Sequence, residues 1–159
     1  MTDEERLIGE ILEAIVNGVA GHFEDCTVRA FDIAKIPDPK DRPWIEIDLR
    51  GWDLDKSLSR GSGSGINAEF ELRIFDCIRD HGGEKNISTR IRGLALRAQN
   101  FIRSNDWGLS NTRGALGDIS VWSDSLDQRI NQEELWVVRW FQGFSCAKSG
   151  EPVGNIPLD

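Results

Sequence analysis

The sequence predicts an α+β domain: a two-layer sandwich in which two helices pack on one face of a mainly antiparallel sheet. Two segments carry apolar residues at helical spacing, and five short segments have strand character, in the order α-β-β-β-α-β-β. With hairpins and two helices that need a sheet face, a two-layer arrangement is favoured. The length of 159 residues suits a single domain, which we expect to span residues 1–147. The last residues, 148–159, contain two prolines and two glycines and are expected to form a loose tail.

The first helix is predicted near residues 3–20. Thr2 and Glu5 form the T-x-x-E pattern of a capping box directly before the apolar series. The apolar residues fall on one stripe, and the glutamates fall on the solvent side. The stripe comprises Leu7, Ile8, Ile11, Leu12, Ile15, Val16 and Val19, and the glutamates are Glu4, Glu5, Glu10 and Glu13.

Three strands are expected next, the last two joined as a long hairpin. A short strand at 26–31 is followed by a proline-rich loop, and then 44–52 and 66–79 alternate between apolar and polar residues. In the 44–52 strand, Trp44 and Trp52 fall on the polar side. The Gly/Ser-rich segment between the hairpin strands predicts a mobile loop that orders on a partner. Lys56 and Arg60, within that loop, are candidate partner contacts.

The second helix is predicted over residues 87–104, and its exposed face is basic. Arg90, Arg97 and Arg103 recur on the surface away from Leu94 and Ala98, and no acidic residue lies between Ile87 and Asn105. These arginines are candidate partner contacts. The alternative interpretation is an ordinary solvated helix face.

Two strands complete the chain, at 118–122 and 135–147. The last strand is apolar on both faces, which is typical of a doubly covered strand or of an interface. One face carries Trp136, Val138, Trp140, Phe144 and Cys146, and the other carries Leu135, Val137 and Phe141. Because two helices are too few to cover both sheet faces, we interpret the second set as candidate interface residues; the alternative is that loops cover these side chains.

Composition narrows the class of partner. The net charge of −8 argues against nucleic acid, because phosphate binding depends on Lys and Arg. No apolar run approaches the length of a membrane helix, and the acidic first residues are not typical of a signal peptide, so a cytosolic protein is expected. The three widely spaced cysteines, Cys26, Cys77 and Cys146, form no metal or redox motif and are interpreted as buried apolar residues.

No catalytic, cofactor-binding or metal-binding residues are predicted. The sequence contains no nucleophile elbow, zinc-protease motif, P-loop or dinucleotide fingerprint. The Gly/Ser run at 61–65 lies between strands rather than before a helix, so it does not predict a phosphate site. The protein is therefore expected not to be an enzyme, although abundant carboxylates leave a paired-acid site open as an alternative.

The overall layout resembles the small tail proteins of tailed bacteriophages and prophages, particularly tail terminators and minor tail proteins, Mu-like and lambda-like members included. The resemblance rests on ISTRIRGLALRAQNFI (87–102) and on LWVVRWFQGFSC (135–146), which follows DISVW. It implies a non-enzymatic ring, typically a hexamer, that caps the tail tube and joins the head connector. It also implies a location in the host cytoplasm during assembly and then in the virion tail. The alternative function is a small-ligand-binding or regulatory domain with a pocket between sheet and helices.

Overall fold

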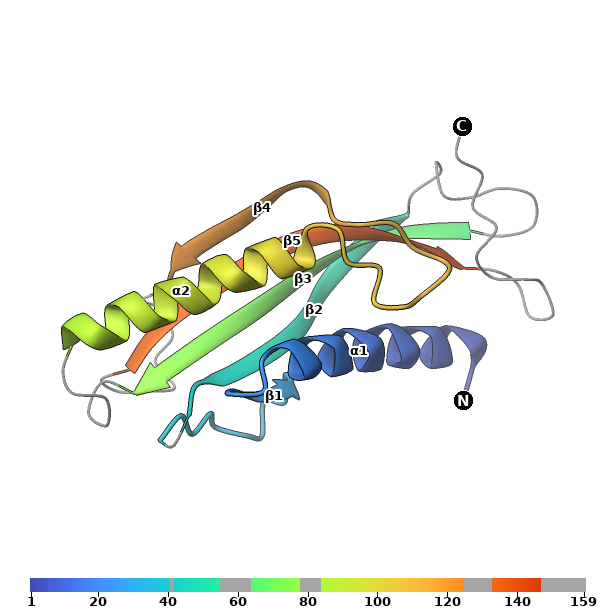
Figure 1. Ribbon diagram of the computed structural model, residues 1–159. Helices are drawn as coiled ribbons and strands as arrows, with labels where there is room; N and C mark the ends of the chain where they lie inside the picture. Colours follow the sequence, from blue (N-terminus) through green and yellow to red (C-terminus); the bar gives the residue numbers. More distant parts are fainter. Residues whose placement is uncertain (41, 55–63, 78–83, 125–132, 147–159) are drawn as a thin grey trace.

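The computed structural model describes residues 1–40, 42–54, 64–77, 84–124 and 133–146 (Figure 1). The elements follow the predicted order, and their bounds lie within a few residues of the predicted ones. The helices are α1 (Asp3–His22) and α2 (Glu84–Ile102), and the strands are β1 (Thr27–Ala30), β2 (Trp44–Leu54), β3 (Ser64–Cys77), β4 (Leu116–Ser123) and β5 (Glu133–Cys146).

The five strands form one sheet in the order β1-β2-β3-β5-β4. β1 pairs with β2 in parallel, and the other three pairings are antiparallel. Figure 1 shows both helices on the same side of the sheet, α1 beside β1 and β2, and α2 along β3, β5 and β4. The predicted α+β sandwich with two helices on one face is confirmed.

The start of α1 is fixed by the predicted capping box. The Glu5 backbone N–H donates to Thr2 Oγ1 at 3.2 Å, and the Thr2 backbone N–H donates to Glu5 Oε2 at 2.7 Å. These two bonds satisfy backbone donors that the first helical turn leaves without a partner. The predicted stripe faces the sheet, where Ile11, Ile15 and Val19 are buried.

The hairpin of β2 and β3 contains a register shift that the sequence pattern did not reveal. Leu49 lies opposite Phe70, but Gly51 lies opposite Glu69, so Arg50 is an extra residue in β2. A bulge of this kind reverses the faces of the residues that follow. Trp52 therefore lies opposite the buried Ala68, on the helix side of the sheet, and its predicted position on the polar side is wrong.

The main core lies between the helices and the inner face of the sheet. As predicted, alternate residues of β3 line this face; they are Ile66, Ala68, Phe70, Leu72 and Ile74. The Phe70 and Trp140 rings stack with centroids 5.1 Å apart, and Trp107 lies 6.2 Å from Trp140. Trp107 also fills the space beside Gly18 of α1, where a Cβ atom would come within 2.9 Å of the indole ring. This aromatic cluster therefore connects α1, the loop that contains Trp107, and the sheet.

A single buried amide satisfies the polar edges of these tryptophans. Gln142 of β5 is fully buried, and its Oε1 accepts bonds from the Nε1–H groups of Trp107 and Trp140 at 3.0 and 3.1 Å. Its Nε2 donates to the backbone carbonyls of Asn105 and Arg113. Because an unpaired polar group in the core is costly, this residue fixes the 105–113 loop against β5.

Candidate assembly surfaces

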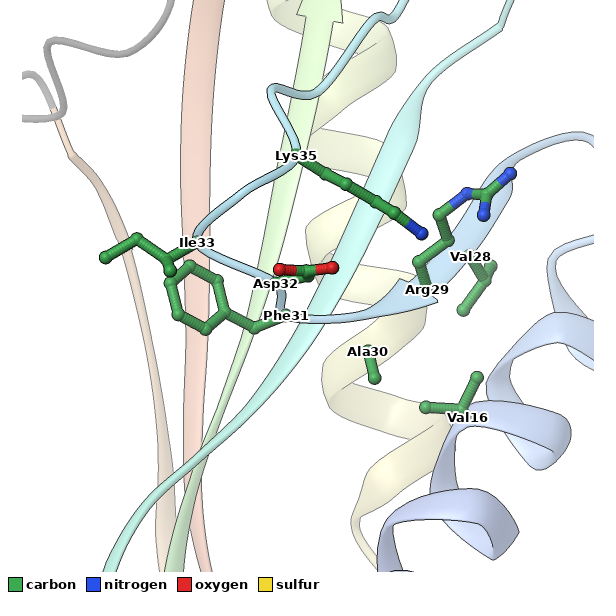
Figure 2. Close-up of a pocket in the computed structure, with 8 residues that line it drawn as sticks. All are labelled: Val16, Val28, Arg29, Ala30, Phe31, Asp32, Ile33 and Lys35. Atoms are coloured by element: carbon green, nitrogen blue, oxygen red, sulfur yellow. The ribbon is translucent and has the colours of Figure 1, made fainter.

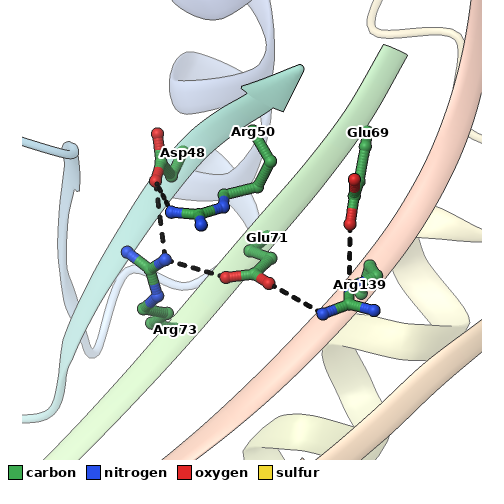
Figure 3. A network of polar contacts seen from close by, with 6 residues as sticks. All are labelled: Asp48, Arg50, Glu69, Glu71, Arg73 and Arg139. Carbon is green, nitrogen blue, oxygen red and sulfur yellow. Dashed lines mark hydrogen bonds and ion pairs between the residues drawn. The ribbon is translucent and has the colours of Figure 1, made fainter. Parts of the chain in front are cut away.

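The outer face of the sheet, opposite the helices, carries a chain of ion pairs across β2, β3 and β5 (Figure 3). Asp48 contacts Arg50 at 3.2 Å and Arg73 at 3.5 Å, and Arg73 contacts Glu71 at 2.8 Å. Arg139 then joins Glu71 at 3.2 Å to Glu69 at 3.0 Å. The hydrogen bond to Asp48 is the main cause that raises the pKa of Arg50. We name these residues the ion-pair network; it comprises Asp48, Arg50, Glu69, Glu71, Arg73 and Arg139.

Aromatic rings lie against two of the three arginines of the ion-pair network. The guanidinium of Arg73 lies 5.4 Å from the Phe31 ring, and that of Arg139 lies 4.7 Å from the Trp122 ring. An arginine that contacts both a carboxylate and an aromatic ring has fewer accessible side-chain conformations than one in solvent. The outer face therefore presents charges that are paired with one another and, for Arg73 and Arg139, also lie against aromatic rings.

The three candidate interface residues of β5 do not share one environment. Leu135 and Val137 are buried in a small second core with Phe75, against which Trp44 and Trp122 pack. Phe141 remains 39% exposed, and its cross-strand neighbour Leu116 on β4 is 38% exposed. Of the three, Phe141 alone is available to a partner to any large extent, and it lies beside an exposed leucine that the sequence analysis did not select.

The arginines of α2 are divided between two sides of the helix. Arg90 faces the sheet, where its Nε donates to Asp76 Oδ2 at 2.8 Å and its Nη2 donates to Oδ1 of the same carboxylate. Asp76 is completely buried, and this bond is the main cause that raises the pKa of Arg90. The prediction that Arg90 belongs to a free basic surface is therefore wrong.

Arg97 is exposed, and its side chain contacts the end of α1. Its guanidinium lies 4.3 Å from the centre of the Phe23 ring and donates to the His22 carbonyl at 2.6 Å. Asp25 lies 3.5 Å away. A cation at the C-terminus of a helix is favoured by the unpaired carbonyls there. Arg97 therefore lies on the surface, as predicted, and also joins α2 to α1; its role as a partner contact stays a prediction.

Arg103 is exposed and lies on the other side of α2, toward β4. It lines a hollow of about 420 Å³ with Gln99 and with Gly117, Asp118 and Ile119. Arg92, also exposed, recurs on this side at helical spacing from Gln99 and Arg103, and it lies over Trp136 of β5. The surface charge of α2 thus points to the edge of the sheet. Lys56 and Arg60, the remaining candidate contacts, lie outside the described residues.

Two features of the described residues concern metal binding and the chemistry of a reactive thiol. No three His, Cys, Asp or Glu side chains among them are arranged to hold a metal ion. Cys26 is buried, and burial followed by the nearby Asp25 carboxylate raises the pKa of its thiol to about 12. A thiol in that state is a poor nucleophile at neutral pH. Neither helix in the described part of the chain is long and apolar enough to cross a membrane.

Comparison with models of known protein families gives no match, and no curated protein is significantly similar to the chain.

Proposed function

We propose that this protein is a non-enzymatic structural subunit of a phage or prophage tail, of the tail-terminator type, which assembles into a ring and contacts the tail tube and the head connector. The observation that carries the proposal is the exposed cross-strand pair Leu116–Phe141 beside the ion-pair network. An apolar contact bordered by charged residues is a common arrangement at protein interfaces. The resemblance in layout supplies the kind of assembly.

The alternative of a small-ligand domain has weaker support. It requires a concave apolar pocket between the sheet and the helices, where ligands of such folds are enclosed. The hollow of about 770 Å³ at β1 lies instead beside the edge of the sheet, lined by Val16, Val28 and the 29–35 segment. That position suits a contact with another chain better than an enclosed ligand.

Phe141→Asp tests the proposal. Because Phe141 is substantially exposed, the variant should fold, with a free energy of unfolding within about 0.5 kcal/mol of wild type. It should lose binding to tail tubes or reduce ring formation, measured by sedimentation velocity over a range of concentrations and by electron microscopy. Ile36→Asp is the matched control, since Ile36 is exposed in the loop between β1 and β2. Wild-type protein that stays monomeric at every concentration and binds no tail component would refute the proposed function.

A further inference from the structure

The sheet ends in two strands that each have one unpaired side within the described part of the chain. β1 pairs only with β2 at one end of the strand order, and β4 pairs only with β5 at the other. Unpaired strand edges are templates for the addition of another strand. A protein with two different open edges can extend its sheet by joining one edge to the other edge of a second copy.

The backbone groups that point to each open edge follow from the hydrogen bonds of the paired side. On β1, the Thr27 N–H donates to the carbonyl of Pro43, directly before β2, and the Phe31 N–H donates to the Ile47 carbonyl of β2, both at 2.8 Å. The backbone groups of Val28 and Ala30 therefore point away from β2. On β4, the Asp124 N–H donates to the Leu135 carbonyl at 2.9 Å. By alternation, Val121 and Ser123 direct their backbone groups away from β5.

Strand direction allows the two edges to pair. β1 runs parallel to β2, and the three antiparallel pairings that follow leave β4 antiparallel to β1. A rotation about an axis along the strands keeps these directions. In a ring built by such a rotation, the β4 edge of one copy therefore meets the β1 edge of the next as an antiparallel pair, the more stable of the two ladder types.

The β1 edge has space for apolar side chains from a neighbouring strand. The hollow of about 770 Å³ lies along this edge, between Val16 of α1 and Val28 and Ala30 of β1 (Figure 2). Ile119 and Val121 of β4 are partly buried against the helix side of the core. When the edges join, these two side chains come to lie on the same face as Val28 and Ala30, beside the hollow.

Charge complementarity identifies the occupant of the edge as a second copy. α1 packs over β1 and β2, and α2 contacts β4, so each helix lies near one of the two edges on the same face. Joining β1 to β4 of another copy brings α1 beside that copy's α2. The exposed side of α1 carries Glu10 and Glu13, whereas the β4 side of α2 carries Arg92 and Arg103. Opposite charges fix the register of such a contact.

We propose that β4 of one copy pairs with β1 of the next, so that the sheet continues from subunit to subunit around a closed ring. This inference rests on the proposed function and specifies its subunit contact. The contact is heterologous, because each copy contributes a different edge, and contacts of this kind close into rings when the rotation allows.

Proline substitutions at the two edges test the contact directly. Ala30→Pro removes an outward N–H group but leaves the bonds between β1 and β2 in place, and Val121→Pro does the same for β4. Each variant alone should sediment as a folded monomer, because every contact needs both edges. An equimolar mixture should form a one-to-one dimer, since one intact edge remains on each partner. Circular dichroism and thermal unfolding check that both variants fold.

Charge reversal provides a second test that does not alter the backbone. Glu13→Arg and Arg103→Glu should each weaken association by about tenfold, and the variant that carries both substitutions should recover it. Asn100→Glu is the control, because Asn100 is exposed on α2 one turn from Arg103 and away from the β4 side. This control should associate like wild type.

The outcomes separate the edge contact from the proposed function. Rings that persist in both proline variants, or a mixture that stays monomeric, would overturn edge pairing while ring formation itself stands. A wild-type protein that associates neither with itself nor with any tail component refutes both proposals together. One proline variant that still dimerises alone would show a contact between like edges and would also overturn the inference.

Discussion

The inner and outer faces of β3 are built from alternate residues of one strand, yet different interactions stabilise them. On the inner face, Phe70 and Leu72 are fully buried against the helices and need no polar partner. On the outer face, Glu71 is only 8% exposed, and its carboxylate forms ion pairs with Arg73 and Arg139. Burial alone therefore does not distinguish the faces. The difference is that the inner face excludes water by packing, whereas the outer face compensates buried charge by pairing.

The largest effect is expected at a fully buried tryptophan of the inner face. Trp140→Ala removes a fully buried ring from the inner face and should cost about 3–5 kcal/mol in the free energy of unfolding, because the core cannot fill the cavity. Trp52→Ala is the control, since Trp52 is 54% exposed although it is on the same side of the sheet. Urea denaturation measures both. Equal losses would contradict the distinction between packed and merely inward-facing residues.

A smaller effect is expected where the inner face contains a charge. Arg90→Ala leaves the buried Asp76 carboxylate without its guanidinium partner and should cost about 1–3 kcal/mol, a value reduced because Arg90 is partly exposed. Arg103→Ala, on the exposed side of α2, should change stability by less than about 0.5 kcal/mol. Thermal unfolding of the two variants gives the comparison. If Arg103 mattered as much as Arg90, the division of the α2 arginines into two sides would be wrong.

On the outer face, removal of a single arginine should lower the free energy of unfolding, and the size of the loss should depend on the salt concentration. Arg73→Ala leaves Asp48 and Glu71 close together without their shared cation, and we expect a loss of about 1–2 kcal/mol. Because the ion-pair network is only partly buried, wild type should lose part of this advantage at high ionic strength. Chemical denaturation at low and high salt measures the difference. A loss that is independent of salt would indicate that packing of the Arg73 side chain, not charge, stabilises this face.

The smallest effect at neutral pH is expected at Cys26, in the main core. The pKa of its thiol is raised from 9.0 to about 12 in the folded protein, so its contribution to stability is complete below pH 9 and is lost as the pH rises toward 12. At pH 8, Cys26 should resist iodoacetamide in the folded protein and react after denaturation in urea. Peptide mass spectrometry detects the product at this cysteine. Rapid native modification would show that this part of the core opens readily.

Much of the fold could be predicted because helices and strands produce capping motifs and apolar periodicity within short segments of the sequence. The capping box at Thr2 and Glu5, and the alternation that starts at Ile66, each lie within one element. The side-chain partners could not be predicted in the same way. Arg97 and the His22 carbonyl are separated by 75 residues, and Arg139 and Glu71 by 68. Neither spacing has a periodic signal, so the sequence showed charged residues without showing their partners.

Two errors have the same physical origin. Periodicity assigned Trp52 to the polar side, but one extra residue at Arg50 reversed its face. Helical spacing grouped Arg90 with the exposed arginines of α2, but Arg90 pairs with the buried Asp76, and the exposed Arg97 donates to the His22 carbonyl. The pattern of apolar and polar residues separates the buried side of a helix from the rest. It does not separate polar residues that make intramolecular contacts from polar residues that face solvent.

The sequence by itself determined the elements, their order and the inner face of the sheet, because apolar periodicity and capping are local properties of the chain. The tertiary structure alone decided the strand order, the parallel position of β1, the ion-pair network and the role of Gln142 as the shared partner of Trp107 and Trp140. These features depend on register between distant segments. The register depends on many contacts across the sheet, so no single residue in the sequence specifies it.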